Sequence, residues 1–142
     1  MKKFEFLSHV ADAYIAAYGS SLEEAFENAA LSLTEVMTDP NTISTTIEDD
    51  ISISAHDEKA LLYGWLEQLI LNFDIDEKIY SRFKVIEILQ NDGNWKLTAK
   101  AYGETFDPSR HPSKTEIKAV TYHQMEIQRS KDGYVAKFIL DL

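Results

Sequence analysis

The chain has 142 residues, of which 44% are hydrophobic and 11% aromatic, and it contains no cysteine. This length suits one domain, here residues 1–142, with a core large enough to fold without cross-links, and the lack of thiols excludes disulfides, thiolate metal sites and cysteine nucleophiles. The formal net charge of −10 disfavours direct binding to nucleic acids or anionic lipids and favours cations and basic protein surfaces as partners.

The N-terminal residues predict neither a signal peptide nor a transmembrane helix. Lys2 and Lys3 are not followed by an apolar run, and no stretch of the chain approaches the roughly 20 apolar residues that cross a bilayer. With no cysteine and no such segment, we expect a cytoplasmic protein without a membrane partner.

The first half of the chain predicts a strand, a helix, a strand and a second helix. After a strand at about 12–18, apolar residues recur at the helical period over about 21–37, where a serine–glutamate capping signal begins the run. Alternation over 50–55 then indicates a strand with one exposed face. The second helical stripe follows Asp57, a suitable N-cap, and predicts a helix near 58–73.

The second half predicts four strands joined largely by hairpins. Runs at 83–89 and 95–102 flank an Asn-Asp-Gly-Asn turn, and runs at 116–128 and 134–140 flank a second turn that contains glycine. These four strands would form an antiparallel meander. The complete pattern predicts an α+β fold, with about six strands in a mainly antiparallel sheet or sheets and two helices packed against them.

Two acidic residues stand close to opposite ends of the chain. Asp12 begins the first predicted strand, and Asp141 is the penultimate residue, beside the terminal carboxylate of Leu142. If the last strand pairs near the first, the carboxylates repel by about 4 kcal/mol at about 4 Å and an effective dielectric of about 20. A bound proton or an oxygen-ligated cation such as calcium or magnesium would relieve that repulsion. Composition alone favours the other interpretation, two separate exposed acids among 24 acidic residues.

Lys118 and His123 lie close together on the strand predicted over 116–128. Lys118 would share a strand face with Glu116, and an exposed pair of this kind stabilises a fold by under about 1 kcal/mol. His123 would share a face with apolar residues, so a hydrogen-bonded core histidine and a site residue are equally compatible with the pattern. The four histidines lack helix-paired metal spacing, and nucleotide-binding loops and common hydrolase motifs are missing from the sequence.

Five segments, taken in order, resemble the archease family. They are His-Val-Ala-Asp at 9–12, Ala-Tyr-Gly-Ser-Ser-Leu-Glu-Glu-Ala-Phe at 17–26, Lys-Ala-Tyr-Gly-Glu at 100–104, Ile-Lys-Ala-Val-Thr-Tyr-His at 117–123, and the terminal Asp-Leu. The departures are Val10, where many relatives have threonine, and Ala13-Tyr14 in place of isoleucine-glycine. Neither departure removes a residue that the resemblance implies as a ligand, although Val10 loses a hydroxyl.

The resemblance implies a divalent cation, typically calcium, held by Asp12, Asp141 and Leu142 at the C-terminus. It also implies an accessory protein with no catalytic residue of its own. Four further residues would face the partner or support the site: His9, Glu104, Lys118 and His123.

Archeases activate the RtcB-type, GTP-dependent RNA ligase of tRNA splicing by promoting its guanylylation and multiple turnover, and the resemblance implies this role here. An acidic protein can meet a basic ligase surface without competing for RNA. One alternative is a stand-alone metal-dependent hydrolase, with an ion held by Asp12 and Asp141 and with His123 as base. Another is an acidic protein-interaction module without an ion. The sequence favours no particular oligomeric state.

Overall fold

The structure, a computed structural model, describes residues 2–9 and 11–142, and of Ser8 and His9 it describes only the backbone. The described chain forms seven strands, two α-helices and one short 3-10 helix. In order these are β1 Phe4–His9, β2 Asp12–Gly19, α1 Leu22–Met37, η1 Pro40–Thr42, β3 Ile47–Ala55, α2 Glu58–Asp76, β4 Lys78–Asn91, β5 Asn94–Thr105, β6 Ala119–Ser130 and β7 Gly133–Asp141.

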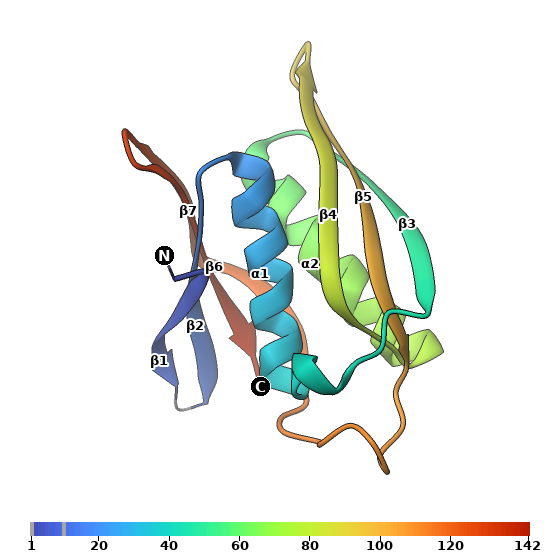
Figure 1. The fold of residues 1–142 in the computed structure, drawn as a ribbon. Coiled ribbons are helices and arrows are strands. Elements are labelled where there is room, and N and C mark those ends of the chain that lie inside the picture. The colour runs from blue at the N-terminus through green and yellow to red at the C-terminus, as the bar shows by residue number, and fades with distance from the viewer. Residues whose placement is uncertain (1, 10) are drawn as a thin grey trace.

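The two helices lie between two antiparallel sheets (Figure 1). One sheet has four strands in the order β1-β2-β7-β6, and the other has three in the order β3-β5-β4. Helix α1 contacts β2 and β4, whereas α2 contacts β6 and β3. Because both sheets pack on the helices, large side chains such as Phe26 and Trp65 are completely buried, and the Trp65 indole donates a hydrogen bond to the Phe26 carbonyl at 2.9 Å.

Both helices begin where the sequence predicts. The Ser21 hydroxyl accepts from the Glu24 backbone N–H at 3.1 Å, and Asp57 caps α2 by accepting from the Ala60 N–H at 2.7 Å. Helix α2 ends at Asp76, three residues beyond the predicted end at 73. Its last turn includes Ile75, whose 73% exposure places it outside the apolar stripe on which the prediction was based.

The prediction of an α+β fold is confirmed. The prediction that the last four strands form one antiparallel meander is wrong. Hairpin β4–β5 belongs to the three-stranded sheet and hairpin β6–β7 to the four-stranded sheet, so the segment 106–118 crosses from one sheet to the other. Strand β1 was not predicted, because it is short and its register shifts between Phe6 and Ser8, which breaks the alternation that identifies a strand. Strand β6 begins at Ala119, three residues later than expected.

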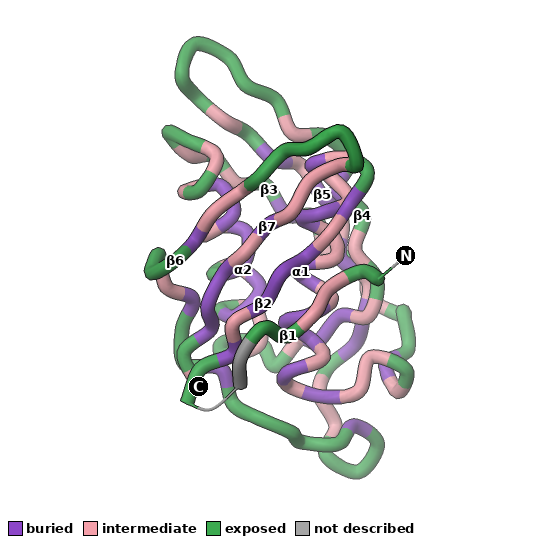
Figure 2. The backbone as a smooth tube through the Cα atoms, turned by 90° about the vertical axis from the view of Figure 1, so that its left-hand side faces the viewer, coloured by how far each residue is buried: buried purple, intermediate pink, exposed green. Residues whose placement is uncertain are grey.

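The pattern of buried residues follows the arrangement of two helices between two sheets. Figure 2 shows buried residues along the helices and the central strands, and exposed residues at the hairpin turns and along much of β6, which lies beside α2. Within the described chain, neither helix is long and apolar enough to cross a membrane.

Candidate functional site

The start of strand β2 and the end of strand β7 lie side by side in the four-stranded sheet. Strands β2 and β7 pair antiparallel over their whole length, with Asp12 directly opposite Asp141. Ala119 of β6 is opposite Asp141 on its other side, and the Lys118 N–H donates to the Asp141 carbonyl at 2.8 Å. The pairing on which the sequence argument depended is therefore present.

Burial of the inward-facing residues fixes this register. Ala13 of β2 and Phe138 and Leu140 of β7 are completely buried in the core, and a shift by one residue would turn these side chains toward solvent. Leu142 also packs partly buried against the core, which holds the terminal carboxylate beside Asp141. The apolar register thus brings three anionic groups to one end of the sheet.

The paired aspartates form an electrostatically unfavourable arrangement. Residues directly opposite in an antiparallel pair share a sheet face, and like charges in that position are destabilising. Asp12 and Asp141 are both exposed, and no ion pair to either side chain occurs among the described residues. A cation from solution would offset this repulsion.

The donor set fits a hard divalent cation. Asp12, Asp141 and the terminal carboxylate offer only oxygen atoms, which suit calcium or magnesium. No group of three His, Cys, Asp or Glu side chains that could hold a metal occurs in the described part of the chain. The two aspartates and the chain terminus are the oxygen donors that this end of the sheet offers to such an ion.

Lys118 lies beside Asp141, whereas His123 lies farther along β6, within its bulge, and both are exposed. Exposure excludes the core-histidine interpretation of His123, whose backbone N–H donates to the Thr121 hydroxyl at 3.0 Å. The expected alternation fails here because β6 bulges: its register shifts between Thr121 and Glu126. The expected pair of Lys118 with Glu116 is missing from the ion pairs of the described residues, since both precede the strand. The side chain of His9 lies outside the described part of the structure.

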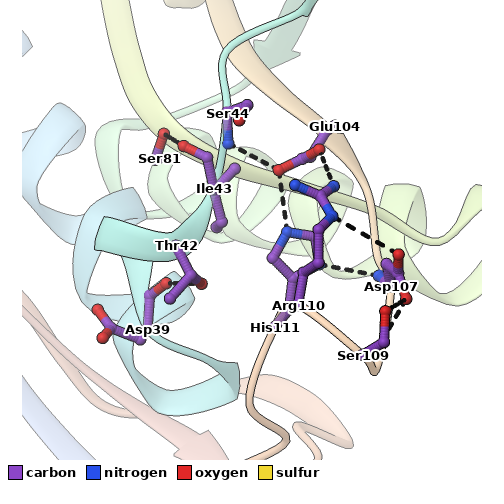
Figure 3. A network of polar contacts seen from close by, with 10 residues as sticks. All are labelled: Asp39, Thr42, Ile43, Ser44, Ser81, Glu104, Asp107, Ser109, Arg110 and His111. Carbon is purple, nitrogen blue, oxygen red and sulfur yellow. Dashed lines mark hydrogen bonds and ion pairs between the residues drawn. The ribbon is translucent and has the colours of Figure 1, made fainter.

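Glu104 occupies a different environment, at the end of β5, where Arg110 and His111 of the crossing segment 106–118 point toward it (Figure 3). Its carboxylate pairs with Arg110, contacts His111 Nε2 at 2.9 Å and accepts the Ser44 N–H at 2.7 Å. Glu104 is only 8% exposed and His111 only 1%. With its oxygens engaged in this way, Glu104 is placed to support the fold and not to contact a partner directly.

The hydrogen bonds of this buried cluster fix its protonation. The Asp107 N–H donates to His111 Nδ1 at 2.8 Å, so the ring proton is on Nε2 and is donated to Glu104. Hydrogen bonds from Arg110 and from the Ser44 backbone lower the pKa of Glu104 to about 2. The carboxylate is therefore ionised at neutral pH, and it ties the crossing segment to β5 and to the segment that precedes β3.

Sequence reasoning missed Arg110 and His111 as parts of this cluster. The available signal was weak: an Asp-Pro-Ser-Arg-His-Pro segment at 107–112 with two prolines, typical of an ordered loop. Nothing in the spacing links that loop to Glu104.

Three comparisons with known proteins point to the same family. The model of the archease protein family matches residues 4–142. The chain is 44% identical over 142 residues to the protein archease of Sulfolobus acidocaldarius, covering 100% of both chains, and 40% identical over 141 residues to that of Methanosarcina acetivorans, covering 99% of this chain and 97% of the relative. The chain belongs to the archease family.

Solved structures support the same fold. A solution structure of a Methanobacterium thermoautotrophicum protein is 42% identical and superposes with a TM-score of 0.86 over 100% of both chains. A Thermotoga maritima crystal structure described as an archease and possible chaperone is 22% identical, with a TM-score of 0.60, and covers 97% of this chain and 96% of its own; at that identity it shows the fold alone. This chain therefore has the archease fold over its full described length.

Proposed function

We propose that this archease activates an RtcB-type RNA ligase in tRNA splicing by promoting ligase guanylylation and multiple turnover. Membership of the family supports the role. The observation that carries the site is the direct opposition of Asp12 and Asp141 in the sheet register. Two like charges kept opposite each other at an exposed end of the sheet cost stability, and a binding role accounts for an arrangement that stability alone disfavours.

The proposed site holds a divalent cation through Asp12, Asp141 and the terminal carboxylate of Leu142. When bound, calcium or magnesium supplies positive charge to this end of the sheet. The chain's own contribution is positional: β2 and β7 hold the carboxylates opposite each other, and the Lys118 N–H fixes the Asp141 backbone. Lys118 and His123, both exposed, extend the same end of the molecule as residues available to the ligase.

The charge of the chain supports a protein partner over RNA. A net charge of −10 repels phosphates, whereas an enzyme that binds RNA carries basic surface around its path. Complementary charge accelerates association and selects the partner. We therefore place the ligase contact on the exposed end that carries Asp12 and Asp141.

Ligation over many cycles tests this proposal. The cognate ligase is assayed for guanylylation and for turnover with the wild-type protein, with Asp12→Ala, with Asp141→Ala and with the matched surface variant Glu87→Gln. We expect stimulation by the wild type and by Glu87→Gln, and at least a tenfold loss with either aspartate variant.

Each outcome has a separate meaning. A ligase that turns over equally well without the protein would contradict the activator role, and full stimulation by both aspartate variants would contradict the site. The hydrolase alternative requires chelator-sensitive release of phosphate or nucleotide by the isolated chain, and no third His, Cys, Asp or Glu side chain joins the pair among the described residues to favour it. The ion-free alternative requires that calorimetric titration of the metal-stripped protein with calcium show no binding.

A further inference from the structure

The bulge in β6 presents an aromatic pair outside the candidate cation site. Residues 122–125 lie between the pairs Thr121–Ile139 and Glu126–Lys137, so four residues of β6 are opposite Phe138 alone. Gln124 adopts a left-handed φ of 56°, an uncommon conformation for a residue other than glycine. The bulge turns Tyr122 onto α2, where its ring stacks on that of Tyr63 with centroids 4.3 Å apart and planes 7° from parallel.

Tyr122 keeps one open face. It is 52% exposed, and because Tyr63 covers one face of the ring, the exposure belongs to the other face and the edges. It is the only exposed tyrosine of the seven in the chain, all of which the structure describes. In Figure 2 the exposed part of β6 lies at the margin of the molecule beside α2, where β6 is an edge strand.

At two other tyrosines of this chain, an arginine side chain lies over the face of the ring. The Arg82 guanidinium carbon lies 4.6 Å from the centroid of the Tyr102 ring, and that of Arg129 lies 5.4 Å from the centroid of Tyr134. Both contacts have cation–π geometry. No described cation occupies the corresponding position over Tyr122.

The surroundings of Tyr122 are negative. Burial raises its pKa, and the nearby Asp57, Tyr63 and Glu67 raise it further. Among the ion pairs of the described chain, Asp57 has only the contact with the His56 ring, at 3.2 Å, and that ring is charged only when protonated. Glu67 has no ion pair there. This charge attracts a guanidinium to the open face and repels the phosphates that accompany a stacked nucleobase.

We infer that the Tyr63–Tyr122 pair is a docking point for an arginine side chain of a partner protein. Tyrosine and arginine are both enriched among residues that dominate protein interfaces, and the planar guanidinium stacks on a ring face better than an ammonium does. Tyr122 follows Ala119, the neighbour of Asp141, by three residues, which span about 10 Å of strand. The arginine therefore approaches the same end of β6 as the proposed ligase contact. That the arginine belongs to the ligase rests on the proposed function. The preference of the tyrosine pair for arginine does not rest on it.

Titration of the isotope-labelled full chain, followed by the aromatic resonances of Tyr63 and Tyr122, tests this inference. The probes are a capped Gly-Arg-Gly-Arg-Gly peptide, the same peptide with lysines, and oligouridylate. We expect saturable shifts with the arginine peptide, about fivefold weaker binding of the lysine peptide, and a loss of about fivefold with Tyr122→Ala. Tyr122→Phe retains the ring face and should bind as the wild type does.

Three results would overturn the inference: equal binding of the two peptides, undiminished binding by Tyr122→Ala, or tighter binding of oligouridylate than of the arginine peptide. Because Tyr122 is largely exposed, its replacement leaves the fold intact, and the unchanged spectrum of the core is the control. A chain that binds the arginine peptide but fails to stimulate the ligase would contradict the proposed function while leaving this inference standing.

Discussion

Two groups of charged residues in this archease are built in opposite ways. Around Glu104, a buried carboxylate meets Arg110, His111 and the Ser44 N–H, so that its charge is surrounded by donors. At the end of the four-stranded sheet, Asp12 and Asp141 are exposed and lie opposite each other with like charge. The first arrangement stabilises the fold, whereas the second opposes it.

The difference separates structural charge from functional charge. A buried ion needs partners within the chain, because leaving it unpaired costs several kcal/mol, and its removal therefore damages the fold. An exposed like-charge pair loses little stability when one member is neutralised, and its value depends on what it binds. Acidic residues that are buried and paired should therefore affect unfolding, whereas exposed acidic residues that lie opposite each other without an ion pair should affect binding.

The largest expected effect is on the buried cluster. Glu104→Ala leaves the His111 N–H and the Ser44 N–H without their acceptor, and we expect the free energy of unfolding to fall by about 3 kcal/mol. Urea denaturation measures the change. The control Glu87→Ala, an exposed glutamate without a described ion pair, should stay within about 0.5 kcal/mol of the wild type. Equal effects of the two variants would contradict the distinction.

The same cluster predicts a pH dependence. Its hydrogen bonds hold the pKa of Glu104 at about 2, below the ordinary value of 4.5. A lowered folded-state pKa contributes stability that is complete above the unfolded value and is lost as pH falls toward the folded value. The difference in unfolding free energy between the wild type and Glu104→Gln should therefore be constant from pH 7 to about 5 and shrink between about 4.5 and 2. Urea titrations across that range measure it, and a difference that grows on acidification would contradict the assignment.

The sequence predicts these two regions unequally, for physical reasons. Local signals fix the helix starts at Ser21 and Asp57, because a cap and its first turn are neighbours in the chain. The meeting of Asp12 with Asp141 depends on sheet register, which local periodicity does not encode, so the family resemblance was needed to favour it.

Glu104 is the clearest example of contacts that local sequence patterns do not predict, because its partners come from the crossing segment 106–118 and from the chain before β3. No periodic pattern connects these segments. The β6 bulge was unpredictable for a related reason: the alternation around His123 assumed an uninterrupted strand, and a bulge exchanges the faces of the residues beyond it.

A smaller effect is expected from calcium at the Asp12–Asp141 pair. A cation that binds only the folded chain stabilises it by about 2.7 kcal/mol at 100 times its dissociation constant. Thermal unfolding of the metal-stripped wild type should therefore shift upward on addition of calcium. Asp12→Asn should lose most of that shift, whereas Glu87→Gln, which removes one charge elsewhere, should retain it. An equal shift for all three proteins would place calcium binding away from Asp12.

The smallest effect should appear when no divalent cation is present. In excess chelator, Asp12→Asn removes the repulsion from Asp141 while the amide retains the size of the carboxylate, so the variant should be as stable as the wild type or more stable by up to about 0.5 kcal/mol. Added salt screens exposed charges, so raising its concentration should reduce this gain. Urea denaturation at low and high salt measures both. A substantial loss of stability would mean that Asp12, like Glu104, has a partner within the chain, and the contrast between the two regions would fail.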